Sequence, residues 1–112
     1  MKAGIAFSHD PDAARAGQDA ACRAVASSGA PVLTLLFTTD AYDPAAVLAA
    51  VREQVGSSKL VGFCCAGILT EEGVNLQGVG VCTLAGGFRA FTTLQKNLGG
   101  DPLEAGCRTG DA

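Results

Sequence analysis

The sequence has no tryptophan and only one histidine, one methionine and one tyrosine, and none of its apolar runs approaches the length of a membrane span. The stretch before Ser8 is too short for the apolar core of a secretory signal peptide. Positive charge is also scarce, with 8 Lys and Arg residues against 11 Asp and Glu residues and a formal net charge of -3. We therefore expect a cytoplasmic protein whose partners include neither membranes nor nucleic acids.

Motifs for nucleotides and metals are missing as well. The predicted turn at residues 8–12 has neither a Gly-x-Gly-x-x-Gly fingerprint nor the lysine of a phosphate-binding loop. The cysteines are odd in number and none follows the Cys-x-x-Cys spacing. They are Cys22, Cys64, Cys65, Cys82 and Cys107. Since the Cα atoms of adjacent residues lie too close together for an ordinary disulfide, we expect free thiols, no metal and no cofactor.

What the chain does have is apolar material for one core. Hydrophobic residues make up 48% of its 112 residues, which is enough for a single domain. The periodic pattern fades near residue 96, and glycine and small polar residues dominate beyond it. We therefore predict a single α/β domain over residues 1–96 and a flexible tail over residues 97–112.

Short apolar runs alternate with helical patterns in the first part of the chain. The predicted strands cover residues 3–8, 32–38 and 59–63. The helices between them begin at Asp10-Pro11 and Asp43-Pro44, because an acidic cap followed by proline marks a helix start. Units of strand, helix and strand place their strands in parallel with right-handed crossovers. The carboxyl ends of these strands should therefore share one edge of a sheet.

The pattern changes after Gly67. Residues 68–77 are predicted to be a loop, and residues 78–84 and 88–94 to be a hairpin that turns at Gly86-Gly87. The fold class is thus α/β, a mixed sheet of about five strands with β-α-β-α-β parallel units, an antiparallel β-hairpin and two helices. Two helices leave part of such a sheet uncovered, so we expect a homo-oligomer or a missing second half-domain to cover it.

A small-molecule ligand site is predicted at the shared edge, because ligands of open α/β sheets bind at the carboxyl ends of the strands. The turn at Cys64-Cys65-Ala66-Gly67 consists of small residues that let backbone amides approach a ligand. Asp10 and Asp12 would repel phosphate, so the edge suits hydroxyl, amide or ammonium groups. The predicted ligand-binding residues are Ser8, His9, Thr38, Thr39, Gly62, Cys64, Cys65, Ala66 and Gly67.

Three other interpretations stay open. In the first, Ser8, Thr38 and Asp40 are turn and cap residues that touch no ligand. His9 belongs to the same predicted edge as the two adjacent cysteines, so a Cys–His nucleophile pair, and with it a cysteine-dependent thiol enzyme, is conceivable. The third interpretation is an assembly protein. Its open sheet face pairs with copies of the chain, and the Gly62–Gly67 turn serves packing alone.

The order of segments and the turn Gly62-Phe63-Cys64-Cys65-Ala66-Gly67 together resemble the amino-terminal part of FIST domains, sensory modules of signal-transduction proteins. That family has a Gly-Cys-Ser-Thr-Ala-Gly-like turn followed by a Gly-Val-rich strand. Gly73 and the strand over 78–84 also match, whereas Cys65 replaces a small hydroxyl residue. The resemblance covers residues 3–94, about the first half of a full domain. It implies a non-enzymatic domain that binds a small ligand, such as an amino acid or a related metabolite, and takes part in signalling.

Overall fold

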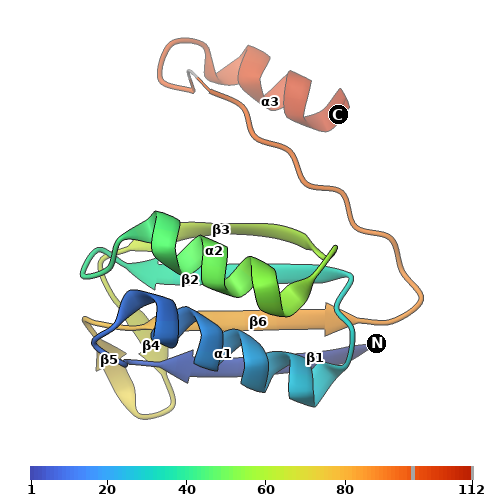
Figure 1. Ribbon diagram of the computed structural model, residues 1–112. Coiled ribbons are helices and arrows are strands. Elements are labelled where there is room, and N and C mark those ends of the chain that lie inside the picture. The colour runs from blue at the N-terminus through green and yellow to red at the C-terminus, as the bar shows by residue number, and fades with distance from the viewer. Residues whose placement is uncertain (97, 112) are drawn as a thin grey trace.

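The computed structural model describes residues 1–96 and 98–111, and Figure 1 shows two helices lying across one face of a four-stranded sheet. The α/β class and the mixed sheet predicted from the sequence are confirmed. The elements in chain order are β1 (Lys2–Ser8), α1 (Ala13–Ser28), β2 (Leu33–Thr39), α2 (Pro44–Val55), β3 (Lys59–Cys65), β4 (Ile68–Thr70), β5 (Gly73–Asn75), β6 (Val79–Ala85) and α3 (Pro102–Asp111).

The strand order of the sheet is β1-β6-β2-β3. Strand β6 is antiparallel to both β1 and β2, whereas β2 and β3 are parallel. Strands β1, β2 and β3 therefore run in one direction and end at one edge, as the sequence predicts. However, β6 lies between β1 and β2, so the first two strands of the chain are not neighbours.

Helix α1 begins one acidic residue later than the sequence predicts. Its N-cap is Asp12, whose Oδ2 accepts a hydrogen bond from the Arg15 backbone N–H at 3.1 Å. The prediction of Asp10 as the cap is wrong. The Asp10 Oδ1 instead accepts a hydrogen bond from the Asp12 backbone N–H at 2.9 Å. The helix ends before Gly29, which adopts φ +84. An Asx turn therefore precedes the helix and takes up the first carboxylate.

The face of the sheet that α1 and α2 cover, here called the helix-covered face, presents small residues where α1 packs on it. A Cβ atom at Gly4 would overlap the Ala24 carbonyl oxygen, so α1 packs directly on the β1 backbone. Thr83 on β6 is fully buried there, and its Oγ1 lies 2.7 Å from Ser28 Oγ and donates to the Ala24 carbonyl at 3.1 Å. Every hydroxyl in this contact has a partner, so these hydrogen bonds offset the cost of removing the hydroxyls from water.

Helix α2 forms as predicted from its cap and proline. The Asp43 carboxylate accepts from the Ala45 backbone N–H at 3.2 Å, and Pro44 occupies the first turn. Its buried residues, Val47, Val51 and Val55, recur at the spacing of one helical face.

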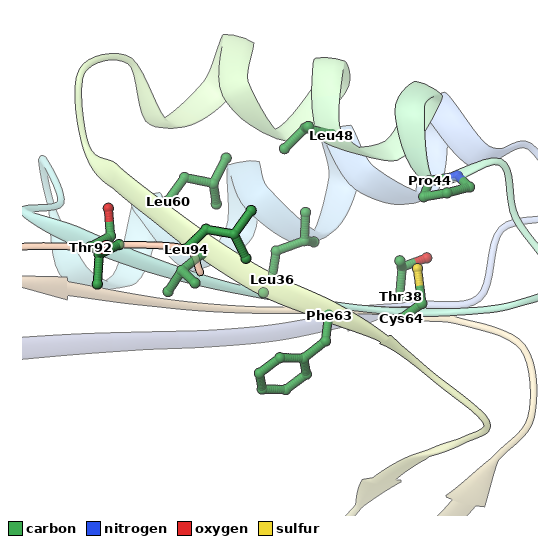
Figure 2. Close-up of a pocket in the computed structure, with 12 residues that line it drawn as sticks. Leu36, Thr38, Pro44, Leu48, Leu60, Phe63, Cys64, Thr92 and Leu94 are labelled. Carbon is green, nitrogen blue, oxygen red and sulfur yellow. The ribbon is translucent and has the colours of Figure 1, made fainter. Parts of the chain in front are cut away.

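The opposite face, here called the open face, carries the large apolar side chains of the same strands. The pairing register aligns Ile5, Cys82, Leu35 and Val61 in one row across the sheet, and Phe7, Gly80, Phe37 and Phe63 in the next. Figure 2 shows the Phe63 ring on the side of β3 away from α2, whereas Leu60 points toward the helix. The Phe37 and Phe63 rings lie 5.2 Å apart, which places both on the open face.

Three segments differ from the sequence-based prediction. Residues 88–94 form no strand, because β6 already pairs with β1 on one side and β2 on the other and has no free edge for a hairpin partner. The predicted loop at 68–77 instead contains the β4–β5 hairpin, with Gly73 at φ +127. A third helix, α3, forms within the predicted tail. Residues 97 and 112 of that tail lie outside the described residues, and its flexibility stays a prediction.

Candidate functional site

A groove of about 500 Å³ lies between helix α2, the edge strand β3 and the extended segment that follows β6 (Figure 2). We call it the α2–β3 groove. It is lined by Leu36, Thr38, Pro44, Leu48, Leu60, Val61, Gly62, Phe63, Cys64, Thr92, Thr93 and Leu94. None of these lining residues carries a charge, and most of them are apolar.

Strand β3 supplies this groove with a floor of small groups. A Cβ atom at Gly62 would overlap the Leu36 carbonyl oxygen of the neighbouring strand, so only glycine fits and the floor is bare backbone. The Cys64 thiol is exposed beside it. Thr38 is 4% exposed, and its Oγ1 donates to the Thr39 carbonyl at 3.3 Å. The groove therefore offers a thiol, a recessed hydroxyl and leucine side chains to a ligand.

A second depression, of about 1190 Å³, lies between β1, the turn that follows it, the middle of α1 and the β4–β5 hairpin. We call it the β1 groove. Its polar lining residues are Ser8, His9, Asp10, Asp19, Arg23, Thr70, Glu71 and Glu72. The guanidinium of Arg23 is already engaged, because its Nη2 donates to Asp19 Oδ2 at 2.9 Å and to the Phe7 carbonyl.

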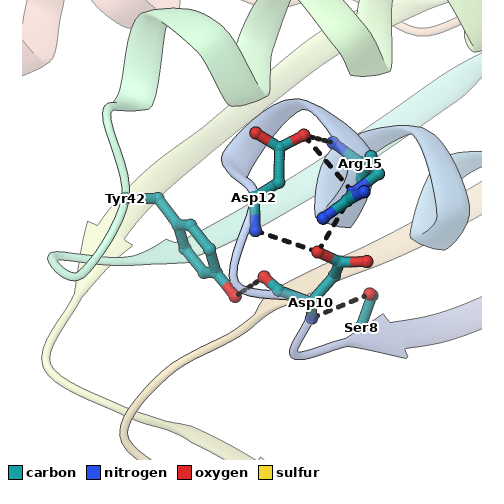
Figure 3. Close-up of polar contacts among 5 residues, drawn as sticks. All are labelled: Ser8, Asp10, Asp12, Arg15 and Tyr42. Carbon is teal, nitrogen blue, oxygen red and sulfur yellow. Dashed lines mark hydrogen bonds and ion pairs between the residues drawn. The ribbon is translucent and has the colours of Figure 1, made fainter.

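The turn between β1 and α1 uses its polar groups internally (Figure 3). Ser8 Oγ accepts from the Asp10 backbone N–H at 3.4 Å, and the Tyr42 hydroxyl donates to the Asp10 carbonyl at 2.7 Å. The Arg15 guanidinium lies 3.4 Å from the Asp10 carboxylate and 3.6 Å from that of Asp12. These contacts hold the turn in place, which is the structural role that the sequence left open for Ser8.

The structure distributes the predicted ligand-binding residues over separate places. Thr38, Gly62 and Cys64 line the α2–β3 groove, and Ser8 and His9 line the β1 groove. The strand order explains the division, because β6 and β2 stand between β1 and β3.

The four remaining predicted residues line neither groove. Thr39 is fully buried, and its Oγ1 accepts from the Gly78 backbone N–H at 3.1 Å. The Cys65 thiol donates to the Thr38 carbonyl at 3.5 Å. Ala66 is exposed, and Gly67 lies against Asn75 at the end of the β4–β5 hairpin.

Several lining residues of the α2–β3 groove were not predicted. Leu48 follows Pro44 by four positions, so both lie on one side of α2, and this spacing was the available signal. Thr92, Thr93 and Leu94 gave no such signal, because the segment was expected to pair with β6.

The Cys–His pair does not form in this fold. His9 follows β1, whereas Cys64 and Cys65 end β3 at the far side of the sheet. Three strand spacings of about 4.8 Å separate these positions by about 14 Å, far beyond hydrogen-bond reach. The geometry thus removes the basis of the thiol-enzyme interpretation.

Within residues 1–96 and 98–111, no group of three or more His, Cys, Asp or Glu side chains gathers as metal ligands would. In the same part of the chain, none of the helices has the length and apolar character needed to cross a membrane.

Comparison with known proteins finds a match to one protein family. No curated protein matches the chain. The sequence pattern of the FIST N domain matches residues 32–111, from the start of β2 through α3, which is more than half of the chain. FIST domains are sensory domains of signal-transduction proteins and are in general not enzymes. The match excludes β1 and α1 but includes most of the segment that the sequence predicted to be a tail. Because this match covers more than half of the chain and includes the turn at Gly62–Gly67, the chain belongs to the FIST N domain family.

Proposed function

We propose that this chain is a sensory domain that binds a small ligand in the α2–β3 groove without chemical turnover. The groove itself carries the proposal, since about 500 Å³ falls within the usual size range of small-molecule pockets. Its apolar walls and few polar groups, the Thr38 hydroxyl and the Cys64 thiol, also match that class of site. Membership of a sensory family supports the same reading.

The lining favours an uncharged, largely apolar metabolite. A carboxylate or ammonium group placed against Leu36, Leu48 and Leu60 would lose its hydration without meeting an opposite charge. A free amino acid, the ligand class implied by the family resemblance, is therefore better suited to the β1 groove, where carboxylates and Arg23 are available. Because Arg23 is engaged with Asp19, we place the proposed ligand in the α2–β3 groove.

A thermal-shift panel of uncharged metabolites and amino acids tests this function. A ligand at 100 times its dissociation constant stabilises the folded state by about 2.7 kcal/mol, which raises the unfolding midpoint by about 10 °C or more in a domain of this size. A broad panel without any shift would count against the sensory proposal.

Labelling of the thiols then locates the site. A ligand in the α2–β3 groove should slow alkylation of Cys64 and leave the exposed Cys22 and Cys107 unaffected. Leu48→Glu should abolish this protection, whereas the matched control Leu103→Glu, on the exposed surface of α3, should keep it. Protection of all three thiols alike would place the ligand elsewhere.

We also propose a cytoplasmic location, because five free cysteines suit a reducing compartment. The expected cover of the open sheet face, by a homo-oligomer contact or by a missing second half-domain, remains a proposal too.

A further inference from the structure

Among the described residues, the outer edge of strand β3 has no partner in the sheet. The strand order places β3 at one end of the sheet, so only β2 pairs with it. The backbone N–H and C=O groups on the other side of Lys59–Cys65 therefore face outward. The same strand carries two exposed apolar side chains, Val61 at 39% and Phe63 at 64%. A free edge of this kind is a place where another extended segment can add a strand.

The segment that follows β6 lies beside this edge. We call residues 91–96 the strap. Thr92, Thr93 and Leu94 line the α2–β3 groove together with β3, and Figure 2 shows Leu94 in front of that strand. Phe91 and the two threonines are residue types that favour a strand. In the described part of the chain, however, no backbone hydrogen bond joins the strap to another segment.

The path of the chain brings the strap to β3 in a parallel direction. Strand β6 ends beside the amino ends of β2 and β3, because Leu84 pairs with Leu33, which in turn pairs with Lys59. Three strand spacings of about 4.8 Å, about 14 Å in all, separate β6 from a strand outside β3. Residues 86–90 span up to about 16 Å when extended, which covers this distance. The strap then starts at the amino end of β3 and runs along it.

The groove is open on the side where the strap lies. Leu48 on α2 is 49% exposed and Leu94 is 80% exposed, although both line the groove. Phe91 at the start of the strap is 84% exposed. Because successive side chains of a strand alternate between its faces, pairing would put Leu94 over the groove and Phe91 on the open face beside Val61. The same movement would thus cover apolar side chains on both sides of β3.

We propose that ligand binding in the α2–β3 groove closes the strap, which then pairs with the free edge of β3 as a fifth strand of the sheet. This inference rests on the ligand-binding function proposed above and adds the moving part of the sensor. Ordering a strand residue costs about as much free energy as its hydrogen bond returns, so the pairing is near balance while the groove is empty. A ligand that contacts Leu94 as well as the groove walls binds the closed form better and shifts the balance toward it.

Hydrogen exchange tests the closure with an apolar group fixed in the groove. In the variant Cys22→Ser/Cys107→Ser, the exposed Cys64 is alkylated with N-cyclohexylmaleimide, and peptide mapping identifies the labelled thiol. We expect the strap amides to exchange at least about 10-fold more slowly than in the unlabelled variant, because a closed strap is open for less than about a tenth of the time. The matched control is Cys64→Ser/Cys107→Ser alkylated at Cys22, which lines neither groove and should leave exchange in the strap unchanged.

A pair of proline variants tests whether the strap closes as a strand. Successive N–H groups of a strand point to opposite sides, so only one of Thr92 and Thr93 can donate to β3. In the Cys64-labelled protein, one of Thr92→Pro and Thr93→Pro should therefore lose the protection of the strap amides, and the other should keep it. Both positions are exposed, so neither proline disturbs the core. Protection lost in both variants, or in neither, would show that the strap does not pair with β3.

Failure of this inference is distinct from failure of the proposed function. The adduct is held covalently, so the exchange measurement does not depend on the affinity of any free ligand. Unprotected strap amides in the Cys64-labelled protein would overturn the closure, even if a metabolite in the thermal-shift panel stabilises the domain. Protection of the strap without any stabilising metabolite would instead support the closure and count against the sensory proposal.

Discussion

The two faces of the sheet use the same four strands in opposite ways. The helix-covered face presents Gly4, Ala6 and hydroxyl side chains to α1, which approaches closely enough to hydrogen-bond through Thr83. The open face presents Ile5, Phe63 and other large apolar groups with little over them. Small residues permit a close and specific contact, whereas large ones supply apolar area to any surface of suitable shape. One face is therefore covered by helices of the chain itself, whereas the other leaves large apolar side chains exposed.

The largest expected effect comes from adding one methyl group to the helix-covered face. In Gly4→Ala the new Cβ would overlap the Ala24 carbonyl oxygen and lie 2.8 Å from Thr83 Oγ1. Because the obstacle is backbone, we expect a loss of about 3 kcal/mol or more in the free energy of unfolding, measured by urea denaturation. Gly87→Ala is the control, since nothing lies within 4 Å of its Cβ position. Equal stability of the two variants would show that α1 does not pack this closely.

A smaller effect compares the same substitution in two environments. Val51 on α2 is fully buried in the core, and Val61 on the open face is 39% exposed. We expect Val51→Ala to cost about 2 kcal/mol and Val61→Ala less than about 1 kcal/mol in the monomer. Denaturation at low protein concentration measures both. If Val61→Ala proved as costly as Val51→Ala there, the open face would be packed in the monomer as well.

The smallest effect concerns the Cys82 thiol on the open face. Burial raises the pKa of this thiol by desolvation, so the folded state holds the proton to higher pH than the unfolded chain. The resulting stabilisation is full below the ordinary thiol pKa and is lost as the pH rises through the raised value. The wild-type stability should thus fall faster in the alkaline range than that of Cys82→Ala. Parallel stability curves for the two proteins would contradict this assignment.

The first half of the chain was predictable because its signals are local. Helix α2 begins after its Asp43 cap and ends before Gly56, which adopts φ +61, and both boundaries are found where the sequence indicates. Helix α3 carries the same signal in Asp101-Pro102, where Asp101 Oδ1 accepts from the Glu104 backbone N–H at 3.1 Å. The signal was present in the sequence, but the segment was predicted to be a tail because glycines surround it.

Strand pairing was not predictable in the same way, because it depends on contacts distant in sequence. Strand β6 has the apolar pattern of a strand, but nothing in its residues shows that it inserts between β1 and β2. This insertion separates Ser8 and His9 from Thr38 and Cys64. The composition of the candidate site could therefore be predicted in part, whereas its division into two grooves could not.

The central position of β6 also has a consequence for synthesis. A ribosome releases β1 and α1 long before residues 79–85, yet Ile5 pairs with Cys82 and Leu35 pairs with the same residue from the other side. The sheet therefore cannot close until nearly the whole domain has emerged, and contacts so distant in sequence slow folding. Until then the nascent chain exposes unpaired strands, which are prone to aggregate. The insertion of β6 into the sheet ends this exposure.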